Sequence, residues 1–250
     1  MTVDLNCDLG EITGGLNDEA IMPYISSASI ACGYHAGNVE TMEKTVRLAI
    51  EYGVWIGAHP GYNDKKNFGR IPILCTPDEL YDLIVSQVSD LSAIASRLGR
   101  KLNHVKPHGA MYNSASSDFE MALVIARAVK EADSSLILVG LSGSELINAA
   151  KSAGIPYASE VFADRAYNDN GTLVPRSVPG SVLDDAGHVI RRAVRMVKER
   201  CVESVTGRII PLEPDTICIH GDNKMAPLFA RELLSAFREA GIIVSPMSRQ

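Results

Sequence analysis

The chain has 250 residues, of which 46% are hydrophobic and 22% are charged, with a formal net charge of −6 at pH 7. This balance is typical of a globular protein with a sizeable core, and the lack of a basic stripe gives nucleic-acid binding little support. No run approaches the length of about 18 apolar residues that a membrane span needs, and the acidic N-terminus MTVDLNCDLGE does not resemble a signal peptide.

The five cysteines predict a reducing compartment. Their number is odd, no CxxC pair occurs, and Cys7, Cys32 and Cys218 lie in apolar runs typical of strands. Buried, reduced thiols in a cytoplasmic protein explain this pattern best. A thiol nucleophile is the less favoured alternative.

Helix signals recur along the chain. The clearest start is Thr76, which is followed by Pro77 and by Glu79 in the position of a capping box. Ser117 and Glu120 repeat the capping-box spacing. Glycines follow several of the segments and predict their ends. The expected helices, in chain order, are 39–52 after Asn38, 77–98, a helix from the Ser117 box to about Ala132, 143–153, one opening at Asp184 or Asp185 and running to about Cys201, and 224–240.

Short apolar or alternating runs lie between these helices and predict strands. The runs are Val3–Leu9, Ser27–Cys32, Val54–Ala58, Leu102–Lys106, Leu136–Gly140, Ile155–Glu160 and Thr216–His220. About seven β-then-α units in a row predict a parallel sheet wrapped by helices. No linker, low-complexity tract or repeat divides the chain, so we expect one domain, residues 1–250.

Strand phase distinguishes the two architectures that fit this alternation, an open doubly wound sheet and a closed barrel. Central strands of a doubly wound sheet are apolar on both faces. In the first strand here one face is apolar, whereas Asp4, Asn6 and Asp8 share the other. In the fourth strand His104 and Lys106 likewise share a face. This asymmetry predicts an α/β barrel whose polar interior runs into an active site.

Titratable side chains recur where the strands end, and catalytic loops gather at these ends in an α/β barrel. They are Asp8 and Glu11 after the first strand, His35 after the second, His59 after the third, Lys106 and His108 after the fourth, Glu160, Asp164 and Arg165 after the sixth, and His220, Asp222 and Asn223 after the last. Recurrence at six strand ends predicts an active site there.

Each of these residues also has a structural explanation. A single histidine at a strand end is more often a hydrogen-bonded structural residue than a catalyst. Two alternatives are of the same kind: Lys106 could pair with a neighbouring acid, and Arg165 could pair with Asp164. Asp4 and Asn6 are equally compatible with a buried network that braces the barrel and with function. Four tyrosines either pack at the rim or line a ligand pocket: Tyr34, Tyr62, Tyr112 and Tyr167.

The residue types at the strand ends suit several kinds of chemistry. Neutral histidines beside carboxylates hold a divalent metal and activate water, or act as general acid and base. Lys106 and Arg165 suit stabilisation of a carboxylate, phosphate or oxyanion. The chain has no GxxxxGK[ST] P-loop, no GxGxxG after the first strand and no GxSxG motif. A conventional nucleotide-binding loop and an α/β-hydrolase are therefore not expected.

Six motifs together resemble the LamB/YcsF family: DLNCDLGE at 4–11, SIACGYHAG at 29–37, GAHPGY at 57–62, VKPHGAMYN at 105–113, EVFADRAY at 160–167 and IHGDN at 219–223. The resemblance implies an irregular seven-stranded β/α barrel similar to those of polysaccharide deacetylases. It also implies the ATP-dependent opening of 5-oxo-L-proline to L-glutamate, a 5-oxoprolinase activity shared with two further subunits, B and C. One departure is Asn38, where the family usually has an aspartate; Asn38 still caps a helix but supplies no carboxylate.

The resemblance, read with the residues, suggests roles. We expect ATP, with Mg²⁺, to phosphorylate the lactam oxygen before water breaks the C–N bond. The expected roles are anion stabilisation for Lys106 and Arg165, proton transfer or metal binding for His35, His59, His108 and His220, and orientation of histidines or binding of Mg²⁺ for Asp8, Glu11, Glu160, Asp164 and Asp222. For a bound divalent metal placed as in the deacetylases, the first candidates are Asp8, His59 and His108.

Two other functions remain open at this point. One is a stand-alone metal-dependent deacetylase or amidohydrolase, which needs a transition metal but no ATP. The other is a non-catalytic subunit that binds a lactam and supplies a partner. The many titratable groups at the barrel mouth argue against binding alone.

Overall fold

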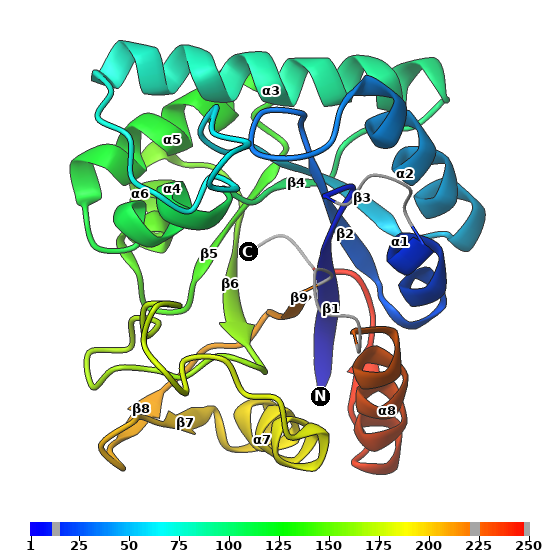
Figure 1. Ribbon diagram of the computed structural model, residues 1–250, viewed down its shortest axis with the longest axis vertical. Coiled ribbons are helices and arrows are strands. Elements are labelled where there is room, and N and C mark those ends of the chain that lie inside the picture. Colours follow the sequence, from blue (N-terminus) through cyan, green and yellow to red (C-terminus); the bar gives the residue numbers. More distant parts are fainter. Residues whose placement is uncertain (12–15, 221–225, 248–250) are drawn as a thin grey trace.

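A closed barrel of parallel strands forms the centre of the molecule (Figure 1). The computed structural model describes residues 1–11, 16–220 and 226–247. The strands of the barrel, in order around it, are β1 (Thr2–Leu9), β2 (Ser27–Ala31), β3 (Trp55–His59), β4 (His104–Val105), β5 (Ile137–Leu141), β6 (Tyr157–Phe162) and β9 (Thr216–His220). The barrel closes because β9 pairs with both β6 and β1. The predicted seven-stranded β/α barrel is therefore confirmed.

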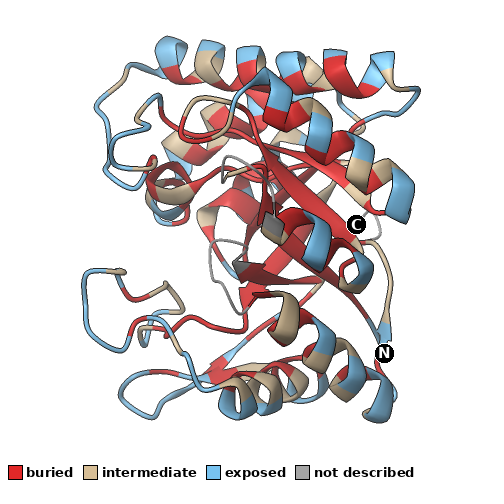
Figure 2. Ribbon diagram, turned by 45° about the vertical axis from the view of Figure 1, so that its right-hand side comes forward, coloured by how far each residue is buried: buried red, intermediate tan, exposed pale blue. Residues whose placement is uncertain are grey.

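Helices surround the barrel and connect its strands. They are α1 (Leu16–Ile21), the 3₁₀ helix η1 (Met22–Tyr24), α2 (Val39–Tyr52), α3 (Pro77–Arg97), α4 (Gly109–Ala115), α5 (Phe119–Ala132), α6 (Glu145–Ala153), α7 (Ala186–Glu199) and α8 (Ala226–Glu239). Figure 2 shows that they bury the faces turned to the strands and expose the opposite faces. None of the described helices is long and apolar enough to cross a bilayer.

The helix starts follow the side chains available to cap them. Asn38 Oδ1 accepts the Thr41 N–H at 2.9 Å, and Thr76 forms the predicted capping box with Glu79. The capping box predicted at Ser117 is wrong, because Asp118 caps α5 instead. Helix α6 starts at Glu145, later than predicted, and α7 starts after Asp185. The predicted start of the last helix, residue 224, lies outside the described residues.

The two faces of the barrel strands differ as predicted. The apolar residues of β1, such as Leu5 and Cys7, are buried in the main core against the helices. On the inward face Asp4 accepts hydrogen bonds from Ser26 and Ser27, both at 2.7 Å. Further along, Asn6 Nδ2 donates to Glu160 Oε1 at 3.0 Å and to Thr216 Oγ1 at 2.6 Å, and Thr216 also bonds Asp4. Asp4 and Asn6 thus belong to a buried network that joins strands across the barrel interior.

The opposite end of the barrel is closed by apolar residues. Strand β10 (Ile243–Val244) pairs with the start of β1 and brings Met247 to this end. Met247 is buried in a small cluster with Ile137, Val139 and Ala158, against which Trp55 packs. Because these partners lie at or near the starts of their strands, the contacts shield the polar interior from water on the side away from the loops.

The segment between β6 and β9 adds a small antiparallel hairpin. It consists of β7 (Cys201–Glu203) and β8 (Ile209–Pro211) and follows α7. All five cysteines are free, and Cys7, Cys32 and Cys218 are buried. The expectation of buried, reduced thiols agrees with these positions.

Close packing inside the barrel makes Gly57 a sensitive position. A Cβ atom there would lie 2.1 Å from His104 Nε2. Because His104 is fully buried and cannot move aside, we expect Gly57→Ala to lower the unfolding free energy by about 1–3 kcal/mol or more. Gly187→Ala, in helix α7, is the control, since its Cβ would meet the flexible end of Arg191 at 3.1 Å and Asp185 Oδ1 at an ordinary contact distance of 3.6 Å. Equal urea midpoints for the two variants would contradict this packing.

Asp4 makes the unfolding free energy depend on pH. Burial raises the pKa of Asp4 to about 6 from 3.8, against the lowering effect of its hydroxyl partners. The folded state therefore binds this proton more tightly than the unfolded chain, and the Asp4 contribution to stability falls as pH rises from about 4 to about 6. We expect the stability of the wild type relative to Asp4→Asn to fall by roughly 2–3 kcal/mol over this range. Urea unfolding at several pH values measures this difference, and a difference independent of pH would contradict the expectation.

Candidate functional site

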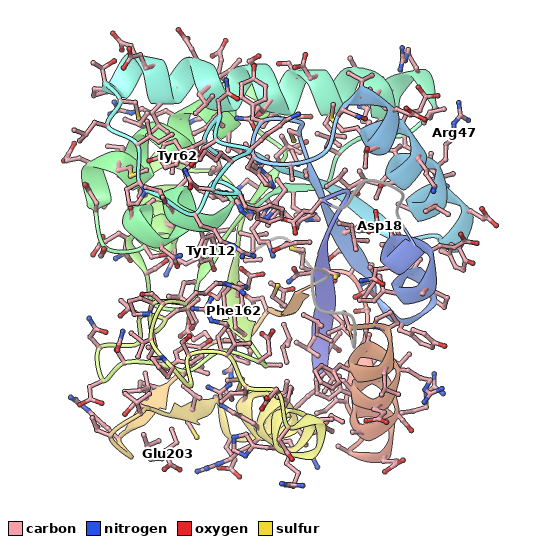
Figure 3. The ribbon with its side chains drawn as sticks, viewed as in Figure 1. Asp18, Arg47, Tyr62, Tyr112, Phe162 and Glu203 are labelled. Carbon is pink, nitrogen blue, oxygen red and sulfur yellow. The ribbon has the colours of Figure 1, made fainter. Side chains whose placement is uncertain are left out.

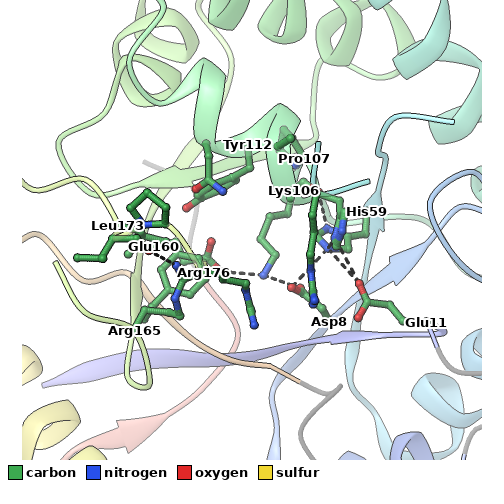
Figure 4. A pocket seen from close by; sticks show the side chains of 18 of the residues that line it. Asp8, Glu11, His59, Lys106, Pro107, Tyr112, Glu160, Arg165, Leu173 and Arg176 are labelled. Carbon is green, nitrogen blue, oxygen red and sulfur yellow. Dashed lines mark hydrogen bonds and ion pairs between the residues drawn. The ribbon is translucent and has the colours of Figure 1, made fainter. Parts of the chain in front are cut away.

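A cavity of about 420 Å³ opens at the C-terminal ends of the strands (Figure 4). Its walls come from β1, β3, β6, helix α4 and the segments that follow β1, β3, β4 and β6. It brings together seven of the predicted site residues: Asp8, Glu11, His59, Lys106, His108, Glu160 and Arg165. The predicted location of the site at the strand ends agrees with this cavity.

Lys106 lies at the centre of the polar residues in the barrel. Its Nζ atom is 2.6 Å from Asp8 Oδ1, 2.9 Å from Glu160 Oε1 and 2.9 Å from Asn6 Oδ1. Burial alone lowers the pKa of Lys106, but the charge of Asp8, together with Cys218 and Glu160, outweighs it and holds the pKa well above its usual value. The three donors of the ammonium group are occupied, so Lys106 fixes two carboxylates in place. This geometry matches the structural explanation considered from the sequence, in which Lys106 pairs with neighbouring acids.

Backbone carbonyls fix the tautomers of His59 and His108. His59 Nδ1 lies 2.7 Å from the Lys106 carbonyl, and His108 Nε2 lies 2.8 Å from the Phe68 carbonyl. A carbonyl only accepts, so each of these nitrogens carries the proton. The other nitrogens, His59 Nε2 and His108 Nδ1, then present lone pairs, although they face each other at 2.9 Å. Two facing lone pairs repel unless a proton or a cation lies between them.

Glu11 and His35 complete this group. Glu11 Oε1 lies 3.3 Å from His108 Nδ1, 3.4 Å from His35 Nε2 and 3.8 Å from His59 Nε2. The His35 ring is buried and stacks on the His108 ring at a centroid distance of 3.8 Å, and neither of its nitrogens makes a hydrogen bond. Burial first, and then the neighbouring histidines, lowers the pKa of His35 well below its usual value, so the ring is neutral.

Glycines allow the backbone of the loops around these histidines to approach the rings closely. A Cβ atom on Gly61 would lie 2.7 Å from His35 Nδ1, and one on Gly69 would lie 2.8 Å from His35 Cβ. Phe68, whose carbonyl bonds His108, has a φ of 56°, an uncommon backbone conformation for an aromatic residue. The segment that carries Glu11 is held by Asp18, whose carboxylate accepts the Gly10 N–H at 2.9 Å. Asp18 is labelled in Figure 3.

The ligand atoms of Glu11, His35, His59 and His108 lie within 4.8 Å of one another. Imidazoles and a carboxylate are the donors that zinc and similar ions prefer, and carbonyl partners of the kind seen here orient metal-bound histidines. The residues therefore fit a divalent metal. Of the candidates predicted from sequence, His59 and His108 are in this group, whereas Asp8 lies beside it, with Oδ2 3.4 Å from His59 Nε2.

Tyr112 and Glu160 form a second polar pair in the cavity. Burial, and then the nearby Glu160 carboxylate, raises the pKa of Tyr112 well above 10, so its hydroxyl remains protonated. The Tyr112 hydroxyl and the Glu160 carboxylate interact with each other, although not with the geometry of an ordinary hydrogen bond. The Tyr112 ring packs edge-on against Phe162 at 5.9 Å (Figure 3). Of the four tyrosines considered from sequence, Tyr112 is the one that lines this cavity.

The remaining predicted residues lie around the cavity or outside the described chain. Asp164 is buried next to Arg165 but does not line the cavity. His220 ends β9, in register with Asp8 of β1, which places its backbone at the same end of the barrel. Asp222 and Asn223 lie outside the described residues. Asn38 uses its side-chain oxygen to cap helix α2 and does not line the cavity.

Sequence reasoning missed two arginines of the cavity wall, Arg70 and Arg176. Arg70 comes from the loop between β3 and α3, and Arg176 from the loop between β6 and α7. Both lie several residues beyond a strand end, where no periodicity or motif marks them. Only the paths of the two loops bring them to the cavity.

Comparisons with known proteins agree with this geometry. A family model described as the LamB/YcsF family matches residues 3–250. A relative from Geobacillus thermodenitrificans, named as the A subunit of 5-oxoprolinase, is 46% identical over 251 residues, covering 100% of this chain and 98% of its own. The protein of the same name from Bacillus subtilis is 45% identical and is 98% covered.

Solved structures show the same fold. The lactam utilization protein of Thermus thermophilus superimposes with a TM-score of 0.90 at 43% identity, covering 98% of this chain and 99% of the other. A family 4 carbohydrate esterase from Streptomyces lividans superimposes with a TM-score of 0.52 at 12% identity, covering 99% and 93%. At that identity the esterase supports the barrel fold alone.

The metal fit can be tested by direct binding. We expect the wild-type protein to bind close to one equivalent of Zn²⁺, and His35→Ala to weaken binding by about tenfold to a hundredfold or more, because a neutral buried donor is lost. Calorimetric titration of the metal-stripped protein measures this. His188→Ala, an exposed histidine on α7, is the control. Stoichiometric binding that is equally strong in both variants would contradict the assignment.

Proposed function

Since the chain belongs to the LamB/YcsF family, we propose that it is the A subunit of a 5-oxoprolinase, the name its full-length relatives carry. The activity is the opening of the cyclic amide 5-oxo-L-proline to L-glutamate, coupled to hydrolysis of ATP. The observation that supports it most is the cavity itself, where an ammonium group bridging two carboxylates, the imidazoles of His59 and His108, and the Tyr112–Glu160 pair face one space.

The reaction needs ATP because a lactam is a poor electrophile. In the proposed sequence the lactam oxygen takes the γ-phosphoryl group of ATP and ADP leaves. Water then adds to the activated carbon, the C–N bond breaks as the nitrogen takes a proton, and a second water releases phosphate to leave glutamate. Catalysis of such transfers depends mainly on positioning and on fixed charges.

The pair of Tyr112 and Glu160 matches the amide of a lactam. A lactam offers one acceptor, its carbonyl oxygen, and one donor, its N–H. The Tyr112 hydroxyl is a donor because it remains protonated, and Glu160 Oε2 is an acceptor whose partner oxygen is already fixed by Lys106. A lactam bound between them can accept a hydrogen bond from the Tyr112 hydroxyl through its carbonyl oxygen and donate one to Glu160 through its N–H group.

The histidines face the water side of the reaction. The lone pairs of His59 Nε2 and His108 Nδ1 are held in place by the two carbonyl contacts, and without a metal they can receive a proton from the attacking water. A divalent metal held by Glu11, His35, His59 and His108 would occupy these lone pairs, and it would then supply Lewis acidity and lower the pKa of water. Asp8 and Lys106 position these groups, and the roles of Asp164, His220 and Asp222 stay predictions.

ATP and its Mg²⁺ are expected to involve other chains. The sequence has no P-loop, and the relatives are named as one subunit of a larger enzyme. We therefore propose that the nucleotide site is formed with partner subunits B and C. The free thiols and the requirement for ATP suit the cytoplasm.

A metal-dependent amidohydrolase that needs no ATP is the second candidate. The observation that favours it is the group of Glu11, His35, His59 and His108. It predicts amide hydrolysis by the isolated protein with Zn²⁺, whereas the 5-oxoprolinase requires ATP and the partner subunits.

The assay is glutamate formation from 5-oxo-L-proline, with and without ATP, by this protein alone and with its partners. We expect ATP-dependent product in the mixture. His108→Ala and Lys106→Ala should lower kcat by about 10²–10³-fold, as loss of a preorganised catalytic group does. Lys101→Ala is the control, because Lys101 is exposed just before β4 at the other end of the barrel. Full turnover in both site variants, or product without ATP, would contradict the proposal.

A further inference from the structure

Three guanidinium groups line the cavity, those of Arg70, Arg165 and Arg176, and Figure 4 shows the last two. Asp8 and Glu160 are bonded to Lys106, whereas the charge of Asp164 acts on Arg165 against that of Arg176. A neutral amide substrate needs no such concentration of positive charge. The wall therefore indicates that the ligand carries an anionic group in addition to its amide.

Arg165 is the fixed member of this set. It is 3% exposed, its Nε donates to the Ser181 carbonyl at 3.2 Å, and its Nη2 donates to the Val174 carbonyl at 2.6 Å. Both carbonyls belong to the loop between β6 and α7, so the loop holds the guanidinium plane in place. Within the described residues Nη1 donates no hydrogen bond, so its N–H groups are fixed in position and can donate to a ligand.

Arg176 is the member without a partner in the described part of the chain. It makes no hydrogen bond or ion pair there, it is only half-buried, and Figure 4 places its side chain between Arg165 and Lys106. Burial, and then the charge of Arg176, lowers the pKa of Arg165 to about 10. Two like charges that approach each other in a half-buried cavity are stabilised by an anion bound between them.

Arg70 reaches the same space from the loop after β3. Its guanidinium group lies 4.8 Å from the centre of the Phe68 ring. Phe68 is the residue whose carbonyl bonds His108, so this loop connects the arginine wall with the histidine wall. Arg70 is exposed, which places it at the rim of the cavity.

We infer that Arg165 and Arg176, with Arg70 at the rim, bind the carboxylate of the lactam substrate and so select lactams that carry an acidic group. The inference rests on the proposed function. Arginine suits this role because its planar N–H groups match a carboxylate with two parallel hydrogen bonds. In 5-oxo-L-proline the carboxylate lies on the carbon next to the ring nitrogen. Held by the arginines, it directs the lactam toward Tyr112 and Glu160.

The test is steady-state kinetics of the enzyme reconstituted with its partner subunits. Arg176→Ala should raise KM for 5-oxo-L-proline by about 10–100-fold, the loss expected for a charged hydrogen bond, with kcat changed by less than about threefold. The KM for ATP should stay unchanged. The probe is 5-oxo-L-prolinamide, the neutral carboxamide of the same lactam. The wild type should discriminate strongly against it, and Arg176→Ala should lose most of that discrimination. Arg176→Lys should recover part of it.

Arg191→Ala is the matched control, because Arg191 is an exposed arginine on α7 outside this cavity. An unchanged KM in Arg176→Ala, or discrimination against the carboxamide that persists in it, would overturn the inference. A rise in KM for ATP alone would overturn it as well, because the arginines would then bind phosphate. These results leave the proposed function intact. If the wild-type complex opens no 5-oxo-L-proline, the proposed function fails, and the inference fails with it.

Discussion

A lysine buried inside a barrel is the interaction on which the rest of the site depends. Lys106 is contributed by the chain directly after β4, and it bonds Asp8 and Asn6 of β1 and Glu160 of β6. A lone ammonium or carboxylate in this position would be strongly unfavourable, but each charge here compensates another. The strands must therefore close in the observed register, because a shift by one residue would turn these groups to the apolar helices.

The same arrangement divides the cavity into regions of different charge. On one side the imidazoles and Glu11 offer lone pairs. In the middle Lys106 neutralises part of the charge of Asp8 and Glu160, and Tyr112 lies beside Glu160. The remaining wall is cationic. A ligand with an amide at one end and an acid at the other can satisfy these regions together, in one orientation.

Much of this could be predicted from the sequence, because it follows from strand period. Alternation of Asp4, Asn6 and Asp8 with apolar neighbours is enough to predict a barrel with a polar interior, and the strand ends locate the site. The tautomers of His59 and His108 could not be predicted, since they depend on carbonyls such as that of Phe68 in another loop. Arg176 was missed for the same reason: a long loop carries it back, and loop paths follow no periodicity.

The most direct test of the account is a double-mutant cycle on Lys106 and Asp8, measured as unfolding free energy. Lys106→Met should destabilise by about 3–5 kcal/mol, because it leaves the buried carboxylates of Asp8 and Glu160 without their shared cation. Asp8→Asn should destabilise less, because Lys106 keeps its ion pair with Glu160. The double variant should be more stable than the sum of these losses predicts, with a coupling energy of about 1–3 kcal/mol. Additive losses would mean that the two charges do not depend on each other, and the bridge would not be what organises this site.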